Sequence, residues 1–188
     1  MERRNSLLVE TVKVLAEKTL DEDLKYAPFK LLHLEETLYY TLHFDNETQK
    51  PIKLKGIIDR VDEKDGLVRI IDYKTGMLDK KYFNYSDPEE SISTSNKEAF
   101  QTLFYTYLYK NVYGANRLQP TILPLKKVNE GYVKVNEKDG DLNDENFEAF
   151  EQKLKEIIHT VLDKNQPIVQ VEDQSVCGMC NYTYICLR

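Results

Sequence analysis

Two short apolar segments on either side of an Asp-Gly turn constrain this chain more than any other feature. Residues 52–61 and 67–74 are rich in Ile, Val and Tyr, and the polar segment between them ends in Asp65-Gly66. β-branched and aromatic residues favour strands, and Asp-Gly between two such segments favours a two-residue hairpin turn. The sequence therefore predicts a β-hairpin over residues 52–74. A turn with a bulge at Gly66 is the alternative, and it would shift the pairing by one residue.

The position of the turn decides which side chains meet. A two-residue turn at positions 65–66 places Asp59 directly opposite Asp72, and alternation then puts Lys74 on the same face. Opposed residues have Cβ atoms about 4.5–5.5 Å apart, a distance at which two carboxylates repel each other. A divalent cation between them reverses that interaction, and Mg²⁺ prefers oxygen ligands. The pattern predicts a metal site, with Lys74 orienting an attacking water or stabilising developing negative charge.

The competing interpretation is that these charges are ordinary solvated side chains on an exposed strand face. Against it, the charges are surrounded by four isoleucines, Ile57, Ile58, Ile70 and Ile71. At least one face of the hairpin is therefore expected to be buried, and a buried charge needs a partner or a metal. Arg60 and Asp62 have a structural interpretation of their own, because the same register pairs Asp62 with Arg69.

The remaining chain alternates between helical and extended patterns. Helices are expected over residues 5–18, 97–113 and 145–163, strands over 37–45 and twice within 120–136, and an exposed loop over 77–96. This order predicts an α/β fold, with a central mixed sheet of about four to five strands flanked by helices. We expect residues 1–170 to form the core, with its N-terminal part incomplete, and residues 171–188 to form a cysteine-containing tail.

Charge is distributed unevenly along the 188 residues. Residues 137–173 hold eleven Asp or Glu and four Lys, which gives this segment a net charge of −7. The net charge of the whole chain is −6, so the remaining residues together carry +1. A nucleic-acid path must avoid that acidic stretch. No apolar run approaches the ~20 residues that span a bilayer, and no signal peptide is evident. We expect a cytoplasmic protein without a membrane partner.

Two motifs, in order, resemble those of a known enzyme family. Residues 56–62 read Gly-Ile-Ile-Asp-Arg-Val-Asp, and residues 71–76 read Ile-Asp-Tyr-Lys-Thr-Gly. Downstream, Gln101 and Tyr105 form a Gln-X-X-X-Tyr pattern on the expected helix. Together these resemble the PD-(D/E)XK nuclease superfamily, and more narrowly its RecB/AddB-like exonuclease branch. The resemblance covers about residues 35–115, and the cysteine tail extends it.

The resemblance implies a restriction-endonuclease-like core, with the 77–96 loop near the substrate, and a set of residue roles. Asp59 and Asp72 would bind Mg²⁺ or Mn²⁺, with the Tyr73 carbonyl as a further ligand, and Lys74 would be catalytic. Gln101 and Tyr105 would position DNA or the lysine; their alternative is a core-edge amide and a packed ring. Glu35 is a possible accessory acid, with a plain surface residue as its alternative.

The three cysteines, Cys177, Cys180 and Cys186, all lie within the last twelve residues. They resemble the C-terminal part of the iron–sulfur staple of AddB-type nucleases, in which a fourth, upstream cysteine completes a [4Fe–4S] cluster. No upstream cysteine occurs in this chain. The fourth ligand would have to come from outside it; the alternative is three reduced, partly packed thiols. Thiolates suit either an iron–sulfur cluster or zinc.

The histidine that this branch carries before its first strands is also missing. His33 and His43 are the upstream candidates, and packing or surface roles suit them better. Since the missing His and Cys belong to the same upstream region, we expect the chain to be a C-terminal piece of a larger protein that works with a helicase-like region. The leading expectation is a deoxyribonuclease, exonucleolytic, in DNA end processing, recombination or repair. The alternatives are a non-catalytic DNA-binding or assembly module and, more weakly, a structural metal-tail domain.

Overall fold

A five-stranded sheet forms the centre of the computed structural model, which describes residues 2–44, 50–76, 96–135, 142–167, 169–172 and 174–186. The strands, in spatial order, are β1 (Lys30–Leu42), β2 (Ile52–Lys64), β3 (Leu67–Lys74), β4 (Leu118–Pro124) and β5 (Val133–Lys134). β3 and β4 run parallel, and the other neighbours are antiparallel. The predicted mixed sheet is therefore confirmed.

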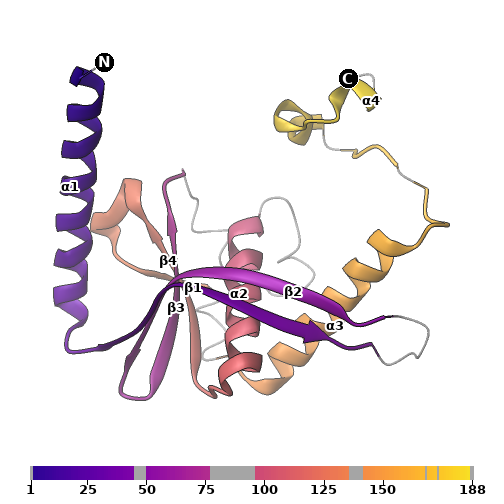
Figure 1. The fold of residues 1–188 in the computed structure, drawn as a ribbon, viewed down its shortest axis with the longest axis horizontal. Coiled ribbons are helices and arrows are strands. Elements are labelled where there is room, and N and C mark those ends of the chain that lie inside the picture. Colours follow the sequence, from indigo (N-terminus) through magenta and orange to yellow (C-terminus); the bar gives the residue numbers. More distant parts are fainter. Residues whose placement is uncertain are drawn as a thin grey trace.

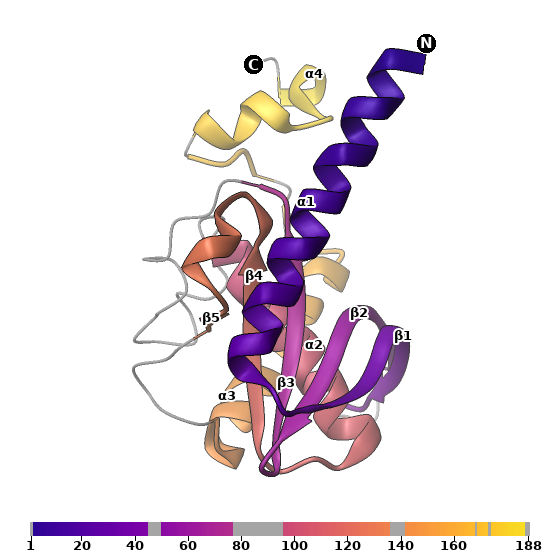
Figure 2. The ribbon, with the colours of Figure 1, turned by 90° about the vertical axis from the view of Figure 1, so that its left-hand side faces the viewer.

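Helices cover both faces of this sheet (Figures 1 and 2). The helical segments are α1 (Glu2–Tyr26), α2 (Lys97–Tyr113), η4 (Leu125–Glu130), α3 (Asp144–Leu162), η6 (Gln174–Met179) and α4 (Thr183–Cys186). α1 and η4 lie on one face, and α2 covers the other. α3 packs against α2 through Phe150, whose ring makes tilted contacts with the rings of Phe100 and Tyr107. The predicted α/β class is confirmed. None of the described helices has the length and hydropathy needed to cross a membrane.

The β2–β3 hairpin has the predicted two-residue turn. Asp65 and Gly66 both adopt positive φ, 53° and 77°, as a type I′ turn requires. Pairing runs from Lys64–Leu67 to Arg60–Ile71 without a shift. The alternative with a bulge at Gly66 is therefore wrong, and the register deduced from the sequence holds over this part of the hairpin.

The main core lies between the sheet and α2. Ile58, Val61, Ile70 and Ile122 are fully buried and belong to one cluster with Tyr107 and Leu108 of the helix. β4 is buried on both faces over most of its length, as expected for the parallel strand at the centre of such a fold. The helices expected over residues 97–113 and 145–163 are present with clear ends: Gly114 closes α2 in the left-handed conformation, and Asn143 caps the start of α3.

Two elements are longer than their patterns predicted. α1 continues to Tyr26 because its last turns are held by the buried polar residue Asp23, which an apolar repeat does not reveal. β1 begins at Lys30, although residues 24–36 show no clear strand pattern. A register shift after Leu31 and a positive φ at Glu35 interrupt the alternation there. The predicted 77–96 loop lies outside the described residues except for Asn96, which is buried at the start of α2.

Gly56 allows α2 to approach β2 closely. A Cβ at this position would lie 2.7 Å from Leu108 Cδ1 and 3.0 Å from Tyr105 Cδ1. Leu108 is fully buried, so neither it nor the strand moves freely. Gly56→Ala is expected to lower the free energy of unfolding by about 1–3 kcal/mol, measured by urea denaturation. Gly76→Ala, where no heavy atom lies within 4 Å, serves as the control. Equal stabilities of the two variants would contradict this packing.

Candidate active site

The site begins where the β2–β3 ladder ends. Recorded pairing stops at Arg60–Ile71, so the strands separate just before Asp59 and Asp72. The Tyr73 N–H, which would meet a β2 carbonyl in a continued ladder, donates instead to Asp59 Oδ2 at 2.7 Å. One Asp59 oxygen is thereby fixed at the strand junction. The side chain acts in place of a backbone acceptor and holds its carboxylate beside β3.

Asp72 lies in a buried position next to a cation. Its residue is only 3% exposed, and Lys74 Nζ lies 2.8 Å from Oδ2. The buried Oδ2 faces this ammonium and has no further hydrogen-bond donor among the described residues. A buried carboxylate needs such a partner, so Lys74 offsets much of the cost of burying Asp72. The oxygen keeps a lone pair available for a ligand.

The electrostatics of Asp72 reflect this burial. Desolvation raises the pKa of Asp72 above its ordinary value, against the lowering effect of the Lys74 ammonium. The charges of Asp59 and Glu98 raise the pKa further. Asp59 and Asp72 therefore act on each other through space, and the structure brings together the two carboxylates that the sequence singled out.

A hydrogen-bonded chain joins Lys74 to helix α2. Lys74 Nζ donates to Gln101 Oε1 at 2.5 Å, and Gln101 Nε2 donates to Tyr105 OH at 2.7 Å. Gln101 and Tyr105 are one helical turn apart, so their side chains share a face. The Gln-X-X-X-Tyr pattern therefore lies beside the lysine, with the amide bridging ring and ammonium. This arrangement fixes the ammonium over the Asp72 carboxylate.

The oxygens present fit a divalent cation. Among the described residues no group of three or more His, Cys, Asp or Glu side chains is placed to hold a metal, so protein side chains offer two carboxylates. Mg²⁺ is commonly held by one or two carboxylates, with waters and phosphate oxygens completing its shell. The buried Oδ2 of Asp72 and the hard oxygens of Asp59 suit such an ion. A backbone oxygen, for which Tyr73 is the candidate, would add to them.

The other residues singled out by the sequence lie elsewhere. Glu35 is an exposed residue of β1 with φ of 50°, and no hydrogen bond or ion pair links it to the carboxylates among the described contacts. His33 packs against Tyr113, with ring centroids 4.9 Å apart, as a packing histidine does. Cys177, Cys180 and Cys186 lie in the η6–α4 segment without forming a disulfide, and within the described part of the chain they belong to no metal-binding group.

Glu98 is a charged neighbour of the site that sequence reasoning missed. It lies in the first turn of α2, three residues before Gln101, and its charge acts on Asp72. The spacing of Glu98 and Gln101 could have indicated this position, because residues three apart on a helix share a face. Glu98 is a third carboxylate near the centre, although it completes no metal-binding group.

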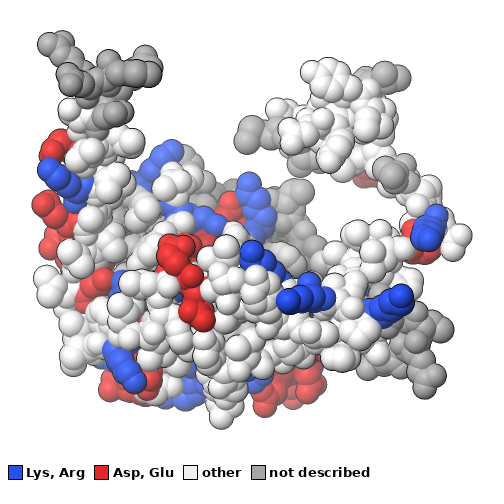
Figure 3. Space-filling view, viewed as in Figure 1, with Lys and Arg blue, Asp and Glu red and all other residues white. Residues whose placement is uncertain are grey.

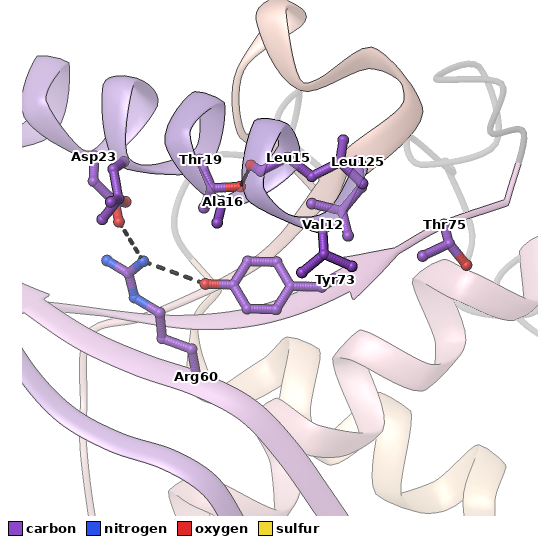
Figure 4. A pocket seen from close by; sticks show the side chains of 10 residues that line it. Val12, Leu15, Ala16, Thr19, Asp23, Arg60, Tyr73, Thr75 and Leu125 are labelled. Carbon is purple, nitrogen blue, oxygen red and sulfur yellow. Dashed lines mark hydrogen bonds and ion pairs between the residues drawn. The ribbon is translucent and has the colours of Figure 1, made fainter. Parts of the chain in front are cut away.

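The opposite face of the same strands holds a buried ionic cluster. Arg69 forms two hydrogen bonds to the carboxylate of Asp62, at 2.7 and 2.8 Å, which confirms the predicted cross-strand pair. Arg60 donates to Asp23 of α1 at 2.7 Å and to Tyr73 OH at 3.3 Å. Figure 4 shows this contact at the wall of a cavity of about 510 Å³, lined largely by apolar residues of α1. The cluster attaches α1 to the sheet behind the site.

Comparison with known proteins agrees with this geometry. The model of the PD-(D/E)XK nuclease superfamily matches residues 2–187 of the chain. No curated protein and no solved structure shows significant similarity to it.

Removing the shared carboxylate of the ionic cluster should unfold the protein readily. Asp62→Ala would leave two buried guanidinium groups short of a counter-ion, a change that typically costs about 3–5 kcal/mol. Asp144→Ala removes a carboxylate that is 83% exposed and paired with Lys110, so its effect should stay below about 1 kcal/mol. Urea denaturation of both variants tests the contrast. Similar losses would show that the cluster does not anchor the fold.

Asp72→Asn should stabilise the metal-free protein at neutral pH. The raised pKa means that the contribution of Asp72 is fully present below its unfolded value of about 3.9 and is lost as pH rises through the folded value. Asparagine suffers no such loss, so the advantage of the variant should grow as pH rises above about 4. Thermal unfolding in EDTA from pH 4 to 8 measures it. A wild type that is more stable at pH 7 would contradict the account.

Adding Mn²⁺ provides the matching comparison. A ligand that binds only the folded state raises its stability, so Mn²⁺ should raise the melting temperature of the wild type and leave that of Asp72→Asn nearly unchanged. Equal shifts in both proteins would place the ion elsewhere.

Proposed function

Because the chain belongs to the PD-(D/E)XK nuclease superfamily, we propose that it hydrolyses phosphodiester bonds of DNA with the help of Mg²⁺ or Mn²⁺. The observation that supports this most directly is the convergence of Asp59, Asp72 and Lys74 where β2 and β3 separate. Carboxylates that hold a cation, next to an ammonium, are the groups that phosphodiester hydrolysis requires.

Each residue has a distinct role in this proposal. Asp59 and Asp72 hold the cation, which when bound supplies positive charge at the scissile phosphate. Lys74 orients the attacking water and stabilises the negative charge that develops on the phosphate oxygens.

Gln101 and Tyr105 act as positioning residues. Gln101 accepts from Lys74 and donates to Tyr105, so the amide restrains the lysine independently of its ion pair with Asp72. The lysine side chain has several rotatable bonds, and a second hydrogen-bond partner narrows the range of positions that its ammonium group can take. The Gln-X-X-X-Tyr pattern thus supports the lysine geometrically.

The wider assignment follows the same resemblance. We propose an exonuclease of the RecB/AddB-like branch that acts in DNA end processing, recombination or repair, with a helicase-like region or subunit presenting the strand. The iron–sulfur interpretation of the cysteine tail stays a prediction. Iron and sulfide assays on anaerobically prepared protein test it, and about four iron atoms per chain are expected for a [4Fe–4S] cluster.

Substitutions at the centre should separate catalysis from folding. Asp72→Ala and Lys74→Ala are each expected to lower the cleavage rate of a labelled oligonucleotide by about 10²–10³-fold or more. Gln101→Ala should lower it by about 10–100-fold, the usual effect of losing a partner that orients a reacting group. Initial rates on single- and double-stranded DNA with Mg²⁺ and with Mn²⁺ measure these losses.

Matched controls are available on the surface. Asp144→Ala and Lys13→Ala each remove one member of an exposed ion pair outside the site, and both should cleave at the wild-type rate. If wild type and Asp72→Ala behave alike, the nuclease proposal for this chain fails. DNA binding without cleavage in either metal would favour a non-catalytic DNA-binding or assembly module.

A further inference from the structure

A groove adjoins the candidate active site on the side of helix α2. Its volume is about 550 Å³, and its lining residues are Lys55, Gly56, Ile57, Phe100, Gln101, Phe104 and Tyr105. Gln101 belongs to both places, since it lines the groove and holds Lys74. A group in this groove would therefore lie next to the reacting phosphate.

The wall of the groove is a stripe along α2. Phe100 and Phe104 are one helical turn apart, as are Gln101 and Tyr105. All four are only partly buried, whereas their neighbours Leu103 and Tyr107 are buried in the core. On the strand side, Gly56 contributes no side chain. Three aromatic rings and an amide thus line an open space of restricted size.

The rings of the stripe pack against the core on one side. Phe100 also contacts Phe150 of α3, with centroids 5.5 Å apart, and Phe104 lies 6.3 Å from the ring of its neighbour Tyr105. Aromatic side chains that are already partly buried lose little conformational entropy on binding a flat ligand. They are the usual platforms for unstacked nucleobases.

The outer rim of the groove is basic. Lys55 lines it, and Lys53 follows on the same face of β2, with both ammonium groups near the Tyr39 ring at 5.9 and 4.3 Å. Figure 3 shows Lys or Arg side chains over the region where the β1–β2 ribbon passes α2. The rim therefore suits a phosphate backbone, whose charge attracts lysines regardless of sequence.

We propose that this groove binds one unstacked base of single-stranded DNA, next to the scissile phosphate, with Phe104 as the stacking residue. The inference rests on the proposed nuclease function. The volume lies within the range of roughly 300–1,000 Å³ found for small-ligand sites, which suits a nucleotide. A duplex keeps its bases stacked inside, so only a single strand or a frayed end offers a base to the groove.

An abasic scan tests the proposal. Single-stranded oligonucleotides, each lacking the base at one position, are bound to the wild type in Ca²⁺ and followed by fluorescence anisotropy. We expect one position at which loss of the base weakens binding by about 10-fold, the usual effect of one base–aromatic stack. Phe104→Ala should weaken binding of intact DNA by a similar factor and remove the dependence on that position, while Phe104→Tyr should keep it.

Controls distinguish this proposal from the nuclease assignment. Tyr184→Ala removes an aromatic side chain that is 88% exposed in the tail, and it should bind as the wild type does. A wild type that ignores every abasic position overturns the groove proposal, even if cleavage depends on Asp72. An equal effect of Phe104→Ala on intact and abasic DNA would also overturn it, because a structural defect has no positional dependence. Loss of cleavage dependence on Asp72 would overturn the nuclease proposal instead.

Discussion

The hydrogen bond from the Tyr73 N–H to the Asp59 carboxylate is the interaction on which the site depends. It forms where the β2–β3 ladder stops, and it takes the place of a backbone pair. Because a side chain accepts instead, the Asp59 carboxylate is held beside β3, next to the buried Asp72. Like charges so placed oppose folding, which suits a site selected for chemistry rather than stability.

Each of the two motifs places side chains on both faces of the sheet. Along β2, Asp59 belongs to the candidate site, whereas Arg60 and Asp62 enter the ionic cluster under α1. Along β3, Asp72 and Lys74 face α2, whereas the Tyr73 hydroxyl accepts from Arg60. The alternation of strand side chains produces this division. The ionic cluster therefore supports the sheet directly behind the carboxylates. Neighbouring charged residues of one motif thus serve different purposes, some in the candidate site and others in the attachment of α1.

The hairpin was predictable because its signals are local. Asp65 and Gly66 fix the turn, and the turn fixes the register that pairs Asp62 with Arg69. Helix α2 and its Gly114 end were equally evident from a local pattern. Contacts between distant segments were not. Asp23 bonds to Arg60 across 37 residues, and no periodicity in α1 marks it. The divergence at Asp59 was also invisible, since an ideal ladder predicts continued pairing. The approach of Gln101 to Lys74 was inferred from resemblance, and the bond itself required the fold.

The central claim is that Asp59 and Asp72 share one divalent cation. Anomalous diffraction from crystals soaked in Mn²⁺ tests it most directly. The account predicts a peak between β2 and β3, within coordination distance of an oxygen from each carboxylate, about 2.0–2.3 Å for a hard divalent ion. The same soak of Asp72→Asn crystals should show no peak there. A wild-type map without a peak at this position, or with one bound to only one of the two carboxylates, would contradict the shared site.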